Sequence, residues 1–206
     1  MTKMLAGLVA GAMMAAASAS ATPISFTTSV TGTGTLGGQA FTNSLITFTG
    51  TGDTANQAPF FFPGDYQIPG VTASVSVAGV GSFGITDALR LFVNQGVPDV
   101  GITDLTAGDA LLFTTSPAAA TYDLTTSLGP ISGAPVYLAP YSTVATSGGA
   151  FTLASVRGAA TFQATVGAVT SAVPEAATWA MTVVGLGLVG GSLRRRRPAA
   201  TRVGLA

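Results

Sequence analysis

Short runs in which apolar and small polar residues alternate fill the chain between residues 22 and 170. In the clearest run, residues 71–77, every second residue is valine or alanine and the others are threonine or serine. Turn-forming residues separate these runs, and no long amphipathic helix pattern occurs between the two ends of the chain. The sequence therefore predicts an all-β domain, an antiparallel β-sandwich for which a jelly-roll arrangement is possible. The other predicted strands are residues 24–30, 41–48, 88–93, 99–105, 110–114 and 120–127.

The last two runs of the domain are predicted to form a β-hairpin. Residues 151–156 and 159–166 flank Arg157-Gly158, and a two-residue link containing glycine suits a tight turn. Phe151 and Leu153 would share one face of the first strand. Two glycine-rich clusters are read as further turns, residues 31–34 and 49–52.

The N-terminal residues 1–21 have the parts of a secretory signal peptide. Lys3 is the only charge before an apolar run over residues 4–17, and an Ala-x-Ala pattern follows at Ala19 and Ala21. We expect this helical segment to enter the secretion translocon and to be cleaved after Ala21 or after Ala19. The alternative is an uncleaved anchor, which the short run and its small terminal residues disfavour.

A second uncharged segment, residues 178–193, lies near the C-terminal end. As a helix it would be roughly 24 Å long, a short span for a hydrocarbon core of about 30 Å. Trp179 at its start suits a membrane interface, and the basic cluster after it favours the cytoplasmic side. A transmembrane helix with its basic cluster is therefore predicted over residues 178–197. A buried core helix and a nucleic-acid patch are the alternatives. A core helix seldom ends in adjacent arginines after an uncharged run, and a nucleic-acid binder would not usually leave the rest of the chain acidic. The basic cluster consists of Arg194, Arg195, Arg196 and Arg197.

The residues around this segment resemble a known sorting signal. Pro174, Glu175 and Ala176 come first, then Trp179 and Ala180, then a run rich in glycine, valine and leucine, then the arginines. This order resembles the PEP-CTERM signal in its PEPxxWA variant. The resemblance extends over about residues 173–197.

The resemblance implies an exported protein whose tail is anchored in the inner membrane and processed there by an exosortase, a membrane-embedded transpeptidase-like enzyme. It also implies a destination at the cell surface or outside the cell, and a link to exopolysaccharide and biofilm matrix. Pro174 and Glu175 would be read by the enzyme, Trp179 would set the membrane depth, and the arginines would stop transfer. Ala176 replaces the second proline of the family motif, which frees φ and restores an N–H donor. A permanently membrane-anchored surface protein is the alternative.

These features divide the chain into five predicted parts. They are the signal peptide (1–21), the β-sandwich domain (22–170), the linker and sorting motif (171–177), the transmembrane segment (178–197) and a cytoplasmic tail (198–206). Residues 22–172 carry two arginines and seven aspartates, a formal charge of about −5. An acidic body does not suggest nucleic acid as a partner.

The composition excludes most kinds of catalytic centre. The chain has no histidine and no cysteine, and its one lysine is Lys3. Triad, thiolate, Schiff-base and zinc chemistry are therefore excluded from the body, which leaves only carboxylates. No motif singles out a pair of aspartates for glycoside hydrolysis. The prediction is a non-enzymatic structural protein of the cell surface or extracellular matrix, without a cofactor or metal.

Two patterns in the body have both a functional and a structural interpretation. Asp99, Asp104 and Asp109 recur every five residues, which suggests either a Ca²⁺ site or, as we favour, ordinary turns. The aromatic cluster over residues 58–66 could bind polysaccharide by stacking its rings on sugars. The favoured interpretation is that its rings close one end of the sandwich, since three adjacent phenylalanines are rarely all exposed. The possible ligand residues are Phe60, Phe61, Phe62 and Tyr66.

Overall fold

The computed structural model describes residues 22–138 and 142–167, and this part of the chain is all-β and antiparallel, as predicted. Its strands are β1 (Pro23–Leu36), β2 (Gln39–Asp53), β3 (Ala58–Pro59), β4 (Asp65–Val77), β5 (Gly81–Gly84), β6 (Leu89–Asn94), β7 (Asp99–Asp104), β8 (Asp109–Thr115), β9 (Leu128–Tyr137), β10 (Thr143–Thr146) and β11 (Gly149–Val166). Two short 3-10 helices, η1 (Thr54–Asn56) and η2 (Pro117–Thr121), lie in the connections.

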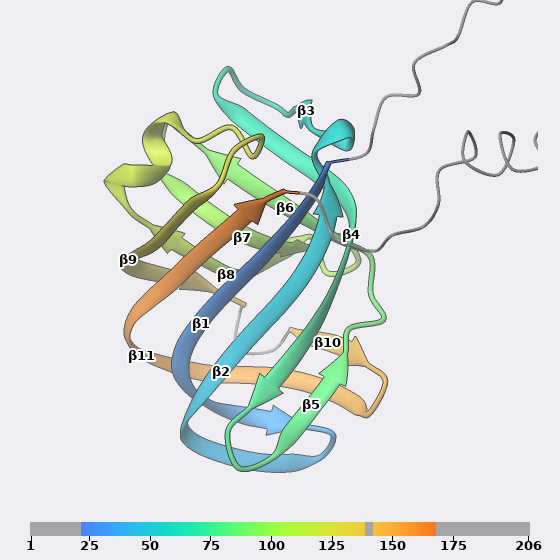
Figure 1. Ribbon diagram of the computed structural model, residues 1–206. Coiled ribbons are helices and arrows are strands. Elements are labelled where there is room, and N and C mark those ends of the chain that lie inside the picture. The colour runs from blue at the N-terminus through green and yellow to red at the C-terminus, as the bar shows by residue number, and fades with distance from the viewer. Residues whose placement is uncertain (1–21, 139–141, 168–206) are drawn as a thin grey trace, which may run out of the picture. The chain divides into compact units, whose positions relative to one another are not determined.

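The strands form one sheet that closes into an eight-stranded barrel (Figure 1). The order is β1-β2-β4-β6-β7-β8-β9-β11, and β11 then pairs with β1 from Ile24↔Val166 to Leu36↔Phe151. The two separate sheets of the predicted sandwich are therefore not observed. The jelly-roll arrangement is wrong, because successive long strands are neighbours. Closure gives β1 and β11 hydrogen-bonding partners that they would lack as edge strands.

Two strands turn the corners of the barrel. β4 pairs with β6 through residues 65–71 and with β2 through residues 72–77, and its register shifts at Gly70, where φ is 69°. β9 pairs first with β11 and then with β8. At this second corner a Cβ on Gly133 would lie 1.8 Å from the carbonyl oxygen of Thr115. Each corner therefore depends on a glycine.

Apolar side chains fill the interior of the barrel. The buried face of β6 consists of Leu89, Leu91 and Val93, in agreement with the alternation of the sequence. Large aromatic residues complete the core, and the fully buried ones are Phe26, Phe48, Phe151 and Phe162.

The two glycine-rich clusters read as turns lie instead inside β1 and β2, so that prediction was wrong. Their glycines make room for neighbouring atoms: a Cβ on Gly50 would lie 2.4 Å from Cζ of Phe26 and 2.5 Å from the carbonyl oxygen of Thr72. The actual turn between β1 and β2 is Gly37-Gly38, where both φ angles are positive. Two residues with positive φ suit a hairpin turn of type I′.

The predicted hairpin at Arg157-Gly158 is also wrong. Residues 149–166 form the single strand β11, and both of its halves pair with β1. Gly158 has a φ of 75° and lies in a bulge, where the register shifts between Ser29↔Thr161 and Thr31↔Arg157. A glycine with positive φ fits a bulge as well as a turn, and here the long partner strand decides between them.

The remaining predicted strands agree with the structure, except one. Residues 24–30, 41–48, 71–77, 88–93, 99–105 and 110–114 fall largely within β1, β2, β4, β6, β7 and β8. Residues 120–127 were predicted to be a strand, but they form the end of η2 and a turn. That turn begins with Asp123, whose side chain accepts hydrogen bonds from the backbone N–H and the hydroxyl of Thr125. The sequence did not predict β3, β5, β9 or β10.

The predicted signal peptide, sorting motif, transmembrane helix and tail lie outside the described residues. Within residues 22–138 and 142–167, no helix is long and apolar enough to cross a bilayer.

Candidate functional site

The loop between β3 and β4 projects two phenylalanine rings into solvent. It is closed by hydrogen bonds from the Phe60 N–H to the carbonyl of Asp65 and from the Asp65 N–H to the carbonyl of Phe62, both 2.9 Å long. Phe61 is 81% exposed and Phe62 is 70% exposed. The interpretation that these rings close one end of the domain is therefore wrong for both. The tight loop turns them away from the core.

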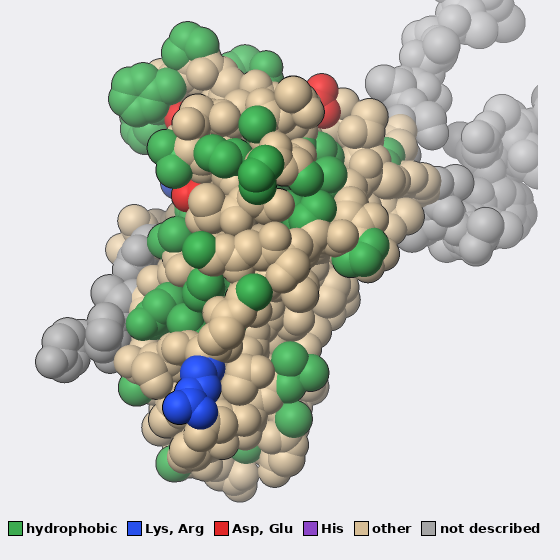
Figure 2. All heavy atoms as spheres, turned by 90° about the vertical axis from the view of Figure 1, so that its left-hand side faces the viewer, with side chains coloured by type: hydrophobic (Ala, Val, Ile, Leu, Met, Phe, Trp, Pro, Cys, Tyr) green, Lys and Arg blue, Asp and Glu red, His purple; other side chains and the backbone are tan. Residues whose placement is uncertain are grey.

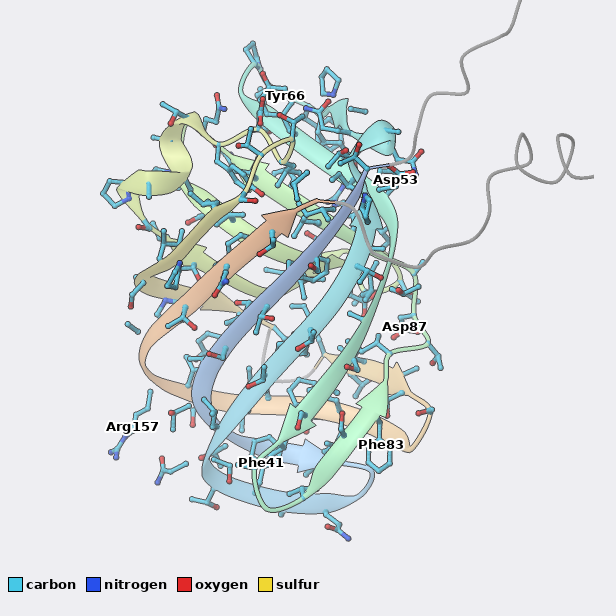
Figure 3. The ribbon with its side chains drawn as sticks, viewed as in Figure 1. Phe41, Asp53, Tyr66, Phe83, Asp87 and Arg157 are labelled. Carbon is cyan, nitrogen blue, oxygen red and sulfur yellow. The ribbon has the colours of Figure 1, made fainter. Side chains whose placement is uncertain are left out.

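Tyr66 does not join these rings. It is half-buried, pairs with Val93 of β6 and packs against the core at the end of the barrel opposite Phe41 and Phe83 (Figure 3). Of the predicted ligand loop, Phe60, Phe61 and Phe62 thus remain as candidates for a contact surface.

Phe60 covers an arginine on the outer side of β6. The alternation that buries Leu89 and Leu91 places Arg90 on the outer side, where Cζ of Arg90 lies 4.1 Å from the ring centre of Phe60 and 5.4 Å from that of Phe92. The centroids of Phe60 and Phe61 lie 4.2 Å apart, and those of Phe60 and Phe92 lie 5.7 Å apart. A guanidinium over aromatic rings gains cation–π attraction.

A further ring extends this surface across β7. The centroids of Phe92 and Phe113 lie 5.7 Å apart, and Gly101 of β7 is the register partner of both residues. A Cβ on Gly101 would lie 2.7 Å from Cδ1 of Phe113, so only glycine lets this ring lie where it does. Val136 of β9, which is 43% exposed, pairs with Phe113 on the far side.

We call the surface formed by these rings and their arginine the aromatic face. Its members are Phe60, Phe61, Arg90, Phe92 and Phe113. The rings come from three separate segments of the chain, and the strands of the barrel hold three of the five residues. Another side of the barrel, shown in Figure 2, carries few charged side chains and several groups of hydrophobic ones.

Arg90 is the only charged member of the aromatic face. Its Nη1 donates to Oε1 of Gln67 over 3.3 Å, while its Nε is buried without a hydrogen-bond partner. Burial lowers the pKa of Arg90 from its ordinary value, because desolvation disfavours the charged form.

The structure separates Asp99 and Asp104, two of the three aspartates in the predicted series. Asp99 and Asp104 lie at the two ends of β7, roughly 17 Å apart at about 3.3 Å per residue. Oδ1 of Asp104 accepts the N–H groups of Thr106 and Ala107, at 2.7 and 3.2 Å, which confirms the turn interpretation for this residue. No group of three metal-ligating side chains occurs within the described ranges. The spacing of five residues therefore reflects the length of β7 and of the connection after it.

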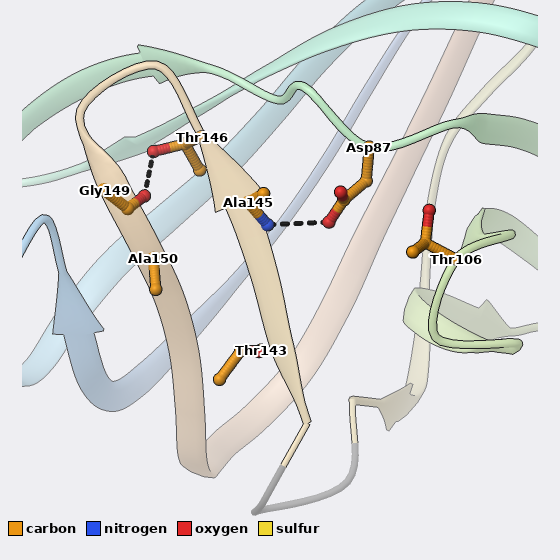
Figure 4. A pocket seen from close by; sticks show the side chains of 7 residues that line it. All are labelled: Asp87, Thr106, Thr143, Ala145, Thr146, Gly149 and Ala150. Atoms are coloured by element: carbon orange, nitrogen blue, oxygen red, sulfur yellow. Dashed lines mark hydrogen bonds between the residues drawn. The ribbon is translucent and has the colours of Figure 1, made fainter.

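One hollow on the surface has polar walls, and some of its polar groups are engaged in hydrogen bonds within the protein (Figure 4). Its volume is about 390 Å³. Oδ2 of Asp87 accepts the N–H of Ala145 at 2.7 Å, and the hydroxyl of Thr146 donates to the carbonyl of Gly149. These groups stabilise the β10–β11 hairpin, so the hollow is a weaker candidate than the aromatic face. It is lined by Asp87, Thr106, Thr143, Ala145, Thr146, Gly149 and Ala150.

Arg90, Phe92 and Phe113 were not predicted as site residues, although the sequence holds a signal for the first two. The alternation in residues 88–93 that predicts a buried face of Leu89, Leu91 and Val93 also predicts that Arg90 and Phe92 face outward. Their proximity to Phe60 depends on how β3 and β4 are placed. The other predicted site residues lie outside the described ranges: Ala19, Ala21, Pro174, Glu175, Ala176, Trp179, Ala180, Arg194, Arg195, Arg196 and Arg197.

Comparison with known proteins provides no further assignment, because no family model, curated protein or solved structure matches this chain.

Proposed function

We propose that the protein is exported to the cell surface or extracellular matrix, and that its barrel binds polysaccharide through the aromatic face. The observation that carries this proposal is the exposure of Phe61, a ring of the aromatic face, at 81%, next to its neighbour Phe62 at 70%. Burial of a phenylalanine side chain is worth about 1.5–3 kcal/mol. Rings that forgo this gain and adjoin other rings are typical of a contact surface.

Polysaccharide is the ligand class that fits this surface and the proposed location. The flat apolar side of a pyranose ring stacks on an aromatic ring, and its hydroxyls remain available to water or to polar groups at the edge. Phe92 and Phe113 are positioned by strands, so little conformational entropy is lost when a ligand binds them.

A binding experiment with paired variants tests this role. The full-length protein is assayed for binding to purified envelope polysaccharides, alongside the double variant Phe61→Ala/Phe62→Ala. We expect affinity to fall by about tenfold or more, since truncation of a central aromatic contact costs upwards of about 1 kcal/mol. Leu45→Ala is the control, because Leu45 of β2 is an apolar side chain with 52% exposure outside the aromatic face.

Two outcomes would count against the proposal. The first is no binding to any envelope polysaccharide. The second is an equal loss of affinity in Leu45→Ala. Circular dichroism of each variant shows whether the fold is intact, and because both exposed rings project away from the core, we expect their removal to leave the spectrum unchanged.

The proposal of export rests on the order of segments in the sequence. The N-terminal run with Ala19 and Ala21 supports secretion through the translocon, and the motif at Pro174 and Glu175 supports processing by an exosortase. Intact-mass measurement of the protein from cell fractions tests both steps. A species that begins at Thr22, ends before the apolar run and lies outside the inner membrane is the expected result.

Permanent anchoring is the second candidate, and Ala176 is the observation that favours it. This residue stands where the family motif has its second proline. A species in the inner membrane that retains all four arginines would support anchoring and contradict processing. In either case we propose a non-catalytic role, since carboxylates are the main reactive groups left in the body.

A further inference from the structure

Arg90 is a cation without an anionic partner. Its contacts are the rings of Phe60 and Phe92 and the neutral amide of Gln67. Within the described ranges no carboxylate lies within ion-pair distance of it. A partly buried charge normally has a counter-charge, because desolvation without one is unfavourable. The aromatic face therefore holds a positive charge that a ligand can neutralise.

The nearest acidic residues on the outer side of the sheet are distant. Arg90 pairs with Thr103 of β7, and Asp99 lies four residues further along that strand, roughly 13 Å away at about 3.3 Å per residue. Asp65 of β4 pairs with Asn94, at the same end of β6 as Asp99. Both separations are far beyond the roughly 4 Å of an ion pair, so neither carboxylate is in contact with Arg90. Asp104 follows Thr103 on β7, but it is the register partner of inward-facing Leu89, and its Oδ1 accepts the N–H groups of Thr106 and Ala107.

The guanidinium also retains donors for a ligand. Nη1 uses one hydrogen on Gln67 and Nε is buried, which leaves Nη2 and the second hydrogen of Nη1. The guanidinium lies against two rings that are nearly perpendicular to each other, and these contacts restrict its movement. A carboxylate that approaches along the aromatic face would form charge-assisted hydrogen bonds, which are among the strongest in proteins.

We propose that the aromatic face selects acidic polysaccharide, with a uronate carboxylate bound by Arg90 while adjacent sugar rings stack on the phenylalanines. This rests on the proposed function and goes one step beyond it, by naming the charge of the ligand. The proposal does not extend to nucleic acid. Binding to a phosphate backbone needs several cations along its path, and the face offers one on a domain of net negative charge.

The decisive experiment compares two ligands that differ only in the carboxyl group. An oligouronate and its carboxyl-reduced, neutral counterpart have the same rings and linkages. Binding of each to the full-length protein is measured by calorimetry, with single-stranded DNA as a third probe. We expect the oligouronate to bind about tenfold or more tightly than the neutral oligomer, with a difference that shrinks at high salt.

Two arginine variants assign the preference to a residue. Arg90→Gln should abolish the preference, so that this variant binds the oligouronate no more tightly than the neutral oligomer. Arg157→Gln is the matched control, because Arg157 is exposed in the bulge of β11, far from Tyr66 and its end of the barrel (Figure 3), and should keep the preference. Arg90→Lys retains the positive charge and should preserve part of the preference for the oligouronate.

The possible failures are distinguishable. Equal affinity for the two oligomers overturns the inference and leaves polysaccharide binding in place, whereas binding of neither overturns both. Loss of the preference in Arg157→Gln as much as in Arg90→Gln, or equally tight binding of DNA, also overturns the inference. The two-ligand comparison with the unaltered protein needs no variant, so it decides the matter even if Arg90→Gln fails to fold.

Discussion

Gly50→Ala tests the role of glycine inside the strands of the barrel. Gly50 lies in β2, and a Cβ added there would meet Cζ of Phe26 at 2.4 Å and the carbonyl oxygen of Thr72 at 2.5 Å. Neither neighbour can move easily, because Phe26 is 1% exposed within the core and Thr72 pairs with β2 through Thr51. The added methyl group must therefore displace either a core ring or a strand.

The expected cost follows from two opposing terms. Forcing extra volume into a packed core costs about 1–3 kcal/mol, and two contacts this short favour the upper end. Replacing glycine by alanine in an extended strand returns about 0.4–1 kcal/mol by restricting the unfolded chain. The net loss is about 2 kcal/mol, which corresponds to a fall in Tm of about 4–8 °C for a domain of this size.

Gly84→Ala is the matched control. Gly84 lies in β5, where the nearest atom to an added Cβ is Oγ of Ser147 at 3.9 Å. Only the favourable term applies there, so the free energy of unfolding should stay level or rise by up to about 1 kcal/mol. Both variants are measured by urea unfolding followed by circular dichroism.

A double variant assigns the loss to the Phe26 contact. In a Phe26→Leu background, Gly50→Ala should cost about 1 kcal/mol less than it does alone, because the displaced ring is gone. The reasoning would be refuted if Gly50→Ala were as stable as the unaltered protein while Gly84→Ala behaved as expected. That result would mean that no close contact at position 50 requires glycine, in spite of the neighbouring Phe26 ring and Thr72 carbonyl.

Two further predictions concern a buried phenol and the bulge of β11. Tyr122 is 4% exposed with an unpartnered hydroxyl, and burial, aided by the charge of Asp123, raises its pKa above the ordinary 10.0. The free energy of unfolding should stay level below about pH 10 and fall above it, because the unfolded chain then releases a proton that the folded chain keeps. Tyr122→Phe should weaken this fall in alkaline urea titrations, and an unchanged pH dependence would contradict the assignment. Gly158→Ala places a side chain at a φ of 75°, with no atom within 4 Å of the added Cβ. Backbone strain alone should therefore lower the free energy of unfolding by about 1–2 kcal/mol. Thermal melts that show equal stability would mean that the bulge relaxes without cost.

The sequence by itself determined which residues form strands and which faces they bury. Valine and leucine at every second position in β4 and β6 predicted both strands and their core side correctly, since side-chain alternation is a property of the extended backbone. Arg90 and Phe92 follow from the same alternation as outward-facing residues. These features are local, and each can be recognised within a window of a few residues.

Tertiary structure decided everything that depends on a partner far away in the chain. Glycine permits a turn, a bulge or the close approach of another strand, so Gly50 and Gly158 could be interpreted only once Phe26 and β1 lay beside them. Closure of the barrel depends on pairing between Ile24 and Val166, for which no local pattern exists. The aromatic face arises in the same way, because Phe60 and Arg90 meet only after β4 has brought the loop over β6.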